Sequence, residues 1–294
     1  MAIKVLPGPK LAERTTLRLG GRARAELFLE SPEDAAGLGE ALAGQAGSPF
    51  MLGWGSNLLA LDHELDLAVV SLSGKAQPEA VGQAEDGRQI VRVSGGCLLT
   101  KLIKWAGERG LAGLEGLSGI PGTVGGVVAC NAGSFGVQTV ELLSRVRLWT
   151  RQGLDWIGPQ AWKAAYRSFE PLNISGPWLV VEAELILNIS DPAAVKTRSA
   201  EVLARKKASQ PLDAASCGCA FKNPAGDSAG RLLDQCGFKG RSLGGMAFSA
   251  KHANFLVNEG HGCAAAALEL IDKARAEVKK RYGVELELEV RVVR

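Results

Sequence analysis

A long, uncharged, glycine-rich run constrains this chain more than any other feature of its sequence. Residues 116–140 carry no charged side chain and include seven glycines, and the central part reads GIPGTVGGVVACNAGSFG. Such a run suits a membrane span, a flexible linker or a backbone surface that lies against a ligand. A membrane helix needs about 20 predominantly apolar residues, and the glycines, Pro121, Asn131 and Gln138 do not meet that requirement. We therefore expect no membrane span here.

The glycines favour a backbone surface that binds an anion. Glycine lets backbone N–H groups approach a ligand because no Cβ intervenes, and successive N–H groups form concave sites suited to phosphate. A second stretch, GWGSN at 53–57, also follows a short apolar run. The sequence contains neither G-x-x-x-x-G-K-[ST] nor a complete G-x-G-x-x-G, which disfavours P-loop and Rossmann enzymes. Two such loops favour a large diphosphate ligand, and structural glycine loops are the alternative.

Length and composition indicate a globular protein of the cytoplasm. The 294 residues suffice for two domains, and 46% hydrophobic with 22% charged residues is ordinary for a folded protein. A net charge of +3 does not favour a nucleic-acid partner. The six dispersed cysteines are typical of reduced cytosolic thiols, and the first residues, MAIKVLPGPKLAERTT, lack the apolar region of a signal peptide.

Hydrophobic periodicity predicts an α+β protein with many short elements. Strands are expected over residues 24–30, 67–72, 89–94, 145–150, 178–187, 254–258 and 284–293. Helices are expected from Ser31 onward and over residues 99–109, 193–209 and 264–282. Pro211 follows the 193–209 helix, a candidate domain connector, and Gly283 ends the last helix. In the final strand, Glu285, Glu287 and Glu289 share one face.

Seven motifs together resemble one enzyme family. In chain order they are GWGSNLL (53–59), GIPGTVGGVVACNAGSFG (119–136), YRS (166–168), GCAFKNP (218–224), GFKG (237–240), SAKHANFLVN (249–258) and LELEV (286–290). This set resembles the UDP-N-acetylenolpyruvoylglucosamine reductase family, in its compact variety, from about residue 16 to residue 290. The first two motifs alone indicate only the wider class of flavoproteins with this FAD-binding fold.

The resemblance implies a fold, a reaction and cofactors. It implies an α+β fold: a two-subdomain FAD-binding region of the PCMH/vanillyl-alcohol-oxidase type over 1–190, then a substrate-binding domain over 191–294. The implied reaction reduces the enolpyruvyl ether of UDP-N-acetylglucosamine-enolpyruvate to UDP-N-acetylmuramate for peptidoglycan, with non-covalent FAD and with NADPH as reductant. Composition, cysteine spacing and the missing membrane span predict a cytoplasmic protein without nucleic-acid, membrane or metal partners, and we expect a monomer.

The resemblance also assigns cofactor-binding residues to both glycine stretches. They are Gly53, Gly55, Ser56, Asn57, Leu58, Gly119, Ile120, Pro121, Gly122, Thr123, Gly125, Gly126, Asn131, Ala132 and Gly133.

Three residues match the family's catalytic positions. Arg167 matches an arginine that binds and polarises the substrate carboxylate, although this chain reads Y-R-S-F where the family reads Y-R-x-S-x-F. Cys219 occupies the proton-donor position, which is serine in most members. A thiol, with an ordinary pKa of about 8.5, gives up a proton more readily than a hydroxyl. Glu289 matches a carboxylate that acts around the developing charge.

Six further residues are expected to contact the substrate. They are Tyr166, Lys222, Gln235, Lys239, His252 and Asn254. A lysine can neutralise a diphosphate, and an asparagine can read uracil or sugar hydroxyls. His252 is equally compatible with a structural role.

Alternatives to this function remain open at the level of sequence. Cys217 and Cys219 form a C-x-C pair, but zinc sites prefer C-x₂₋₄-C with a second matched pair. An FAD-dependent oxidase or dehydrogenase of another sugar or hydroxy acid is the nearest rival. A catalytically inactive flavin- or nucleotide-sugar-binding regulator is the other, supported only by the shortened YRS motif and the serine-to-cysteine change.

Overall fold

The computed structural model describes residues 3–294, which divide into two compact units. The first unit comprises residues 3–8, 24–54 and 66–205, and the second comprises 9–23, 55–65 and 206–294. Both units mix helices and strands, so the α+β class expected from the sequence is confirmed. The units do not coincide with the division at residue 190, because two early segments pack with the C-terminal residues.

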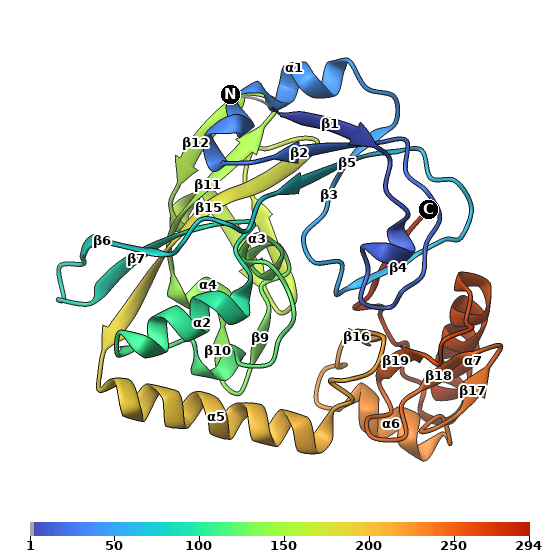
Figure 1. Ribbon diagram of the computed structural model, residues 1–294. Coiled ribbons are helices and arrows are strands. Elements are labelled where there is room, and N and C mark those ends of the chain that lie inside the picture. Colours follow the sequence, from blue (N-terminus) through green and yellow to red (C-terminus); the bar gives the residue numbers. More distant parts are fainter. Residues whose placement is uncertain (1–2) are drawn as a thin grey trace. The chain divides into compact units, whose positions relative to one another are not determined.

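The first unit contains a four-stranded sheet in the order β1-β2-β5-β3 (Figure 1). Its strands are β1 (Lys4–Pro7), β2 (Ala25–Leu29), β3 (Ser48–Met51) and β5 (Leu67–Leu72). β1 is antiparallel to β2, whereas β5 is parallel to both β2 and β3. The helix expected from Ser31 begins as a 3-10 helix, η2 (Pro32–Gly37), and continues as α1 (Leu38–Ala43). A capping box between Ser31 and Asp34 starts this connection between parallel strands.

A larger antiparallel sheet carries the rest of this unit, in the order β12-β11-β15-β7-β6, with β8 also paired to β15. The strands are β6 (Glu79–Gln83), β7 (Gln89–Ser94), β8 (Leu111–Ala112), β11 (Leu143–Thr150), β12 (Gly153–Ile157) and β15 (Trp178–Ile189). The unit's other elements are α2 (Leu99–Glu108), η3 (Glu115–Leu117), α3 (Val124–Ala129), β9 (Gly133–Ser134), β10 (Val137–Gln138), α4 (Thr139–Leu142), η4 (Pro159–Ala161), β13 (Trp162–Ala165) and β14 (Ser168–Pro171). Leu99 and Leu102 of α2 share a hydrophobic core with Val91 and Val93 of β7. The strands predicted at 67–72 and 89–94 are confirmed at the predicted residues.

Helix α5 (Pro192–Ser209) confirms the long helix expected before Pro211. It begins in the first unit, and its last residues belong to the second. The last of the chain's crossings between the two units therefore lies within this helix (Figure 1).

The second unit contains a sheet in the order β16-β19-β18-β17 and two helices. Its elements are η1 (Leu11–Glu13), β4 (Leu58–Ala60), β16 (Ser216–Cys219), α6 (Ala229–Gln235), β17 (Ser242–Leu243), β18 (Met246–Phe248), β19 (Phe255–Asn258), α7 (Ala264–Tyr282) and β20 (Arg291–Val293). Gly283 ends α7 in the left-handed conformation, as its position after the helix predicts.

The final strand is shorter than predicted. The sequence indicates a strand over 284–293, whereas β20 covers Arg291–Val293 and pairs in parallel with β4. The alternation that predicts the strand persists, since Leu286 and Val290 are buried and Glu287 is exposed. It reflects packing of an extended segment, which makes one isolated bridge through Leu288 to Phe221 before β20 begins.

Candidate active site

The glycine segment of the first unit contains a short helix. Residues 119–133 are expected to be bare loop, but Val124–Ala129 form α3, with the Thr123 hydroxyl accepting from Gly126 N as the N-cap. The N–H groups of Val124 and Gly125 donate to the carbonyls of Cys97 and Gly95. Most of this backbone is therefore fixed by protein hydrogen bonds, and the part available to a ligand lies before the helix.

The turn before α3 has the backbone that only glycine adopts readily. Gly119 has φ +80° and Gly122 has φ +155°. Gly53 lies directly against this turn, because a Cβ on Gly53 would come within 2.5 Å of Thr123 Oγ1. The two glycine stretches therefore meet at Gly53 and Thr123.

These residues fit a bound flavin diphosphate. The segment offers backbone amides and small side chains and no carboxylate that would repel phosphate. Ser118, just before Gly119, is buried, and its hydroxyl has no hydrogen-bond partner within residues 3–294. An unsatisfied buried polar group costs about 1–3 kcal/mol, which a cofactor bound at this segment would relieve.

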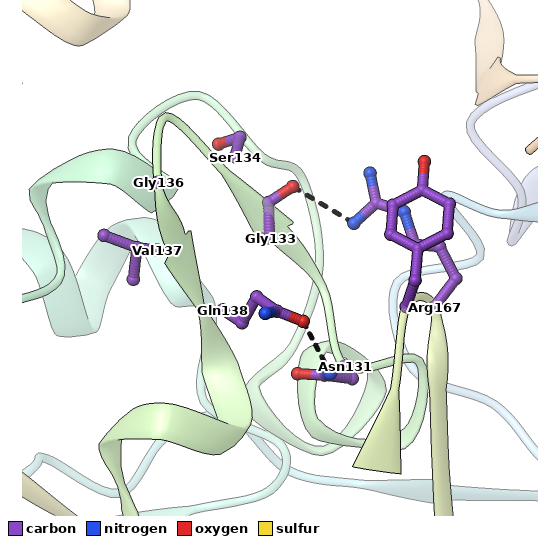
Figure 2. A pocket seen from close by; sticks show the side chains of 8 residues that line it. Asn131, Gly133, Ser134, Gly136, Val137, Gln138 and Arg167 are labelled. Carbon is purple, nitrogen blue, oxygen red and sulfur yellow. Dashed lines mark hydrogen bonds between the residues drawn. The ribbon is translucent and has the colours of Figure 1, made fainter. Parts of the chain in front are cut away.

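A cavity of about 190 Å³ lies beside the glycine segment, around Arg167 (Figure 2). Its lining residues are Asn131, Gly133, Ser134, Gly136, Val137, Gln138, Tyr166 and Arg167. Arg167 Nη1 donates to the Gly133 carbonyl oxygen at 3.1 Å. The only charged side chain in this lining is a guanidinium, so the cavity suits an anion such as a carboxylate.

Arg167 is held in a two-residue turn between β13 and β14. Ala165 pairs with Ser168, which leaves Tyr166 and Arg167 at the tip of the hairpin. Arg167 has φ +57°, a conformation that is costly for a residue with a Cβ. The short Y-R-S-F motif therefore forms a tight hairpin that presents Arg167 to the cavity.

Two aromatic side chains in this unit are exposed although the sequence pattern does not predict a role for them. Trp54 is 50% exposed and Phe135 is 46% exposed. Tyr166, at the tip of the hairpin, is similarly exposed, at 49%. Trp54 and Phe135 each have a glycine as neighbour, in GWG and SFG. An aromatic residue beside glycine in an otherwise small-residue segment was the available signal.

In the second unit, the GSN motif supports the segment that carries Glu289. Asn57 Nδ2 donates to the Glu289 carbonyl oxygen at 3.0 Å, and Arg291 N donates to the Asn57 carbonyl. Gly55 has φ +67°, and a Cβ there would lie 2.1 Å from the Arg14 carbonyl oxygen. This half of the predicted cofactor motif thus has a clear structural role within its own unit.

Cys219 and Glu289 lie on adjacent backbone segments. Glu289 N donates to the Ala220 carbonyl at 2.8 Å, and Phe221 bridges Leu288 in antiparallel fashion. Burial raises the pKa of the neighbouring Cys217 to about 12, and the charges of Cys219 and Glu289 act in the same direction. Cys217 therefore stays a neutral thiol, whereas Cys219 is only partly buried.

Asn254 holds the backbone two residues after Cys219. Its Oδ1 accepts from Phe221 N at 3.0 Å, and its Nδ2 donates to the Phe221 carbonyl at 2.7 Å. The side chain is only 2% exposed. The side chain therefore fixes the backbone at Phe221, and its contact with the sugar nucleotide stays a prediction.

His252 is held beside Asn254. Its Nδ1 accepts from Asn254 N at 3.2 Å, and its ring packs edge-on to Phe255. Burial lowers the pKa of His252 below its ordinary value, so the ring is neutral at pH 7. This geometry matches the structural alternative stated from the sequence.

The three remaining predicted substrate residues are exposed or partly exposed. Lys222 Nζ lies 3.3 Å from Glu287, and Lys239 Nζ lies 3.3 Å from Asp234. Gln235 Oε1 accepts from Arg231 and from the Tyr282 hydroxyl. Surface ion pairs of this kind contribute little to stability, so both lysines can exchange partners.

Two broader features complete the description of residues 3–294. No group of three His, Cys, Asp or Glu side chains in this part of the chain is arranged to hold a metal ion. None of its helices is both long enough and apolar enough to cross a membrane.

Comparisons with known proteins define the class first. Residues 28–154 match the model of the FAD binding domain, and residues 210–293 match the model of the UDP-N-acetylenolpyruvoylglucosamine reductase C-terminal domain. The fold and the glycine segment thus belong to a flavoprotein of the FAD-binding class with an additional C-terminal domain.

Full-length relatives then give the family. The chain is 46% identical to a UDP-N-acetylenolpyruvoylglucosamine reductase of Nitratidesulfovibrio vulgaris, covering 99% of both chains. It is 47% identical to one of Oleidesulfovibrio alaskensis, covering 98% of this chain and 97% of the relative. The crystal structure of the reductase from Thermus caldophilus matches all of both chains with a TM-score of 0.82 and 34% identity. The chain belongs to the UDP-N-acetylenolpyruvoylglucosamine reductase family.

Proposed function

We propose that this chain reduces the enolpyruvyl ether of UDP-N-acetylglucosamine-enolpyruvate to the lactyl ether of UDP-N-acetylmuramate, a precursor of peptidoglycan, at the expense of NADPH. The observation that carries the proposal is membership of the reductase family over the full chain. The arginine-lined cavity beside the glycine segment is the matching chemical feature.

FAD, when bound, supplies the transfer of hydride equivalents from NADPH to the methylene carbon of the substrate. We assign its binding to Gly53 and to the turn at 119–123, where backbone amides replace charged side chains. The FAD is non-covalent in this assignment, and Gly55, Ser56, Asn57 and Leu58 stay predicted cofactor contacts.

We assign Arg167 to the substrate carboxylate. Negative charge develops on this carboxylate and its neighbouring carbon when hydride arrives at the methylene carbon. A fixed guanidinium stabilises that charge without reorganisation, which is the most effective form of electrostatic catalysis. The hydrogen bond from Arg167 to Gly133 O keeps the guanidinium at the cavity before substrate binds.

We assign Cys219 to proton delivery and Glu289 to the support of that step. The carbon next to the carboxylate must gain a proton, and a half-buried thiol is a competent donor. The thiolate left behind is reprotonated from solvent before the next turnover. Lys222 and Lys239 are the candidate contacts for the diphosphate of the sugar nucleotide.

The test is a flavin and turnover assay on the purified protein. We expect a yellow flavin spectrum and NADPH oxidation that depends on the enolpyruvyl sugar nucleotide. Arg167→Ala should lower kcat/KM by about 100-fold or more, while the control Arg151→Ala, at an exposed turn, should match the parent. NADPH oxidation that is independent of the sugar nucleotide would favour a flavin oxidase instead.

We further propose that the protein works as a cytoplasmic monomer. Within residues 3–294 none of its six cysteines is joined in a disulfide, as expected in a reducing compartment. Sedimentation at the chain mass of 30.8 kDa is the expected result, and a larger species would contradict the monomer.

A further inference from the structure

Asn131 has a backbone and a side chain that are both unusual for a residue at a cofactor loop. Its φ is +40°, in the left-handed region, and it is only 2% exposed. Its Oδ1 accepts from Val140 N at 3.1 Å. Its Nδ2 donates to the Ala165 carbonyl at 2.9 Å and to Gln138 Oε1 at 3.2 Å. Protein groups thus engage both polar atoms of the side chain.

The bond to Ala165 fixes the hairpin that carries Arg167. Ala165 is the last residue of β13, directly before the two-residue turn. Two residues after Asn131, the Gly133 carbonyl accepts from Arg167 Nη1 (Figure 2). The segment 131–133 therefore contacts the hairpin at two points. Asn131 holds the base of the turn at Ala165, and Gly133 holds the guanidinium of Arg167.

Gln138 anchors Asn131 in turn. Its Oε1 accepts from Asn131, as Figure 2 shows, while its Nε2 and its backbone N donate to Glu141 in a capping box at the start of α4. The chain of bonds runs from Glu141 through Gln138 and Asn131 to Ala165. The capped start of α4 is thereby linked to the base of the hairpin that carries Arg167.

We infer that Asn131 is a positioning residue for Arg167 and not a ligand of the cofactor. It acts by holding the Ala165 carbonyl, so that Arg167 can keep its left-handed turn with the guanidinium at the cavity. The inference rests on the proposed role of Arg167 toward the substrate carboxylate. It revises the assignment of Asn131 that the family resemblance implies.

The first experiment separates the two half-reactions in an Asn131→Gly variant. Glycine tolerates φ +40° and removes all three side-chain bonds. Because small misplacement of a catalytic group can cost about 100-fold, we expect reoxidation of the reduced enzyme by the enolpyruvyl sugar nucleotide to slow about 10- to 100-fold. Flavin content and the rate of reduction by NADPH should stay within about 2-fold of the parent.

Asn173 provides a matched control. It is also an asparagine with positive φ, +58°, but it is exposed on a turn of the same unit. Asn173→Gly should leave both half-reactions unchanged. Loss of flavin, or equal slowing of both half-reactions, in Asn131→Gly alone would overturn the inference in favour of a cofactor contact or a general folding defect.

A double-mutant cycle tests whether Asn131 acts through Arg167. In an Arg167→Ala background, Asn131→Gly should have little further effect on reoxidation or on the dissociation constant of the sugar nucleotide, measured by titrating the oxidised flavin spectrum. If glycine loosens the fold, Asn131→Asp serves as a second variant. It keeps the oxygen that accepts from Val140 N and removes the amide that donates to Ala165 and Gln138. Additive effects of the two substitutions would overturn the inference.

A crystal structure of the Asn131→Gly variant separates this inference from the proposed function. If the parent enzyme does not reduce the enolpyruvyl compound, the proposed function fails. The positioning role would still be supported by a guanidinium displaced from Gly133 O. A guanidinium that remains on Gly133 O in the variant would overturn it.

Discussion

Two thiols separated by one glycine differ in chemistry because their surroundings differ. Cys217 is buried, and burial raises its pKa to about 12. Cys219 is partly buried and lies next to the segment that carries Glu289. A C-x-C pattern in the sequence cannot distinguish the two residues, whereas in the fold only Cys219 of the pair is partly exposed.

The pH profile of turnover tests the role of Cys219. A donor must carry its proton, and thiols ordinarily titrate near pH 8.5. We therefore expect kcat/KM to fall on the alkaline side, and Cys219→Ser to move this limb to higher pH because a hydroxyl holds its proton more strongly. Cys263→Ser, an exposed thiol of the same unit, should keep the parent profile. An alkaline limb that stays in place in Cys219→Ser would argue against this donor.

The buried thiol of Cys217 is expected to make the free energy of unfolding depend on pH. Burial raises its pKa from the ordinary thiol value, about 8.5 to 9, to about 12 in the folded state, so the folded state binds more protons than the unfolded chain between these values. This contribution is complete below about pH 9 and is lost as pH rises toward about 12, at about 1.4 kcal/mol per pH unit.

Urea unfolding at about pH 8 and about pH 10 measures this contribution. Cys217→Ala should lose less of its unfolding free energy over that interval than the parent does, by roughly 1 kcal/mol. Cys263→Ala should follow the parent. Equal losses in parent and Cys217→Ala would show that the thiol does not titrate in this way.

At the scale of elements, regular hydrophobic patterns were predicted well from the sequence and glycine-rich segments were not. β5, β7 and α7 match their predicted residues because periodic apolar faces specify them. α3 was missed because valine and glycine have low helix propensity. The helix depends on the Thr123 cap and on bonds from its first turn to carbonyls at 95 and 97, which local sequence does not reveal.

The candidate site was predicted unevenly for the same reason. The motifs pointed to Arg167, which lines the cavity, and to the turn before α3, where Gly119 and Gly122 have backbone conformations that suit glycine. They did not reveal that Asn254 is buried against Phe221, since that contact joins residues far apart in the chain. A sequence motif predicts which segment contributes to a site. The orientation of each side chain in that segment depends on hydrogen bonds to distant residues, which the motif does not contain.

A substitution at Gly53 tests the contact between the two glycine stretches. A Cβ at this position would lie 2.5 Å from Thr123 Oγ1, which caps α3. Gly53→Ala should push the turn away and weaken FAD binding by about 10-fold or more, measured as flavin retained after dialysis. Gly39→Ala, in α1 with open space around the site, should retain flavin like the parent. Full retention in Gly53→Ala would exclude a tight role for this contact.

At the scale of the whole molecule, the second unit is assembled from distant parts of the chain. Leu17, Leu19 and Leu59 share a hydrophobic core with Phe221 and Phe248. β20 finds its parallel partner in β4, more than two hundred residues earlier. Sequence patterns could place the elements but not this pairing, because a three-residue strand carries too little information to choose its partner.

This assembly predicts that residues 206–294 do not fold alone. The fragment lacks β4, the three early leucines and Asp62, whose carboxylate accepts from Ala264 N at the start of α7. Each buried leucine contributes about 1.5–3 kcal/mol through its burial, and small domains have only about 5–15 kcal/mol of net stability. Urea titration of the fragment, followed by circular dichroism, should show no cooperative transition, whereas the full chain should show one. A cooperative transition in the fragment would mean that residues 9–23 and 55–65 are dispensable for the core, and the substrate-binding domain proposed over 191–294 could then stand alone.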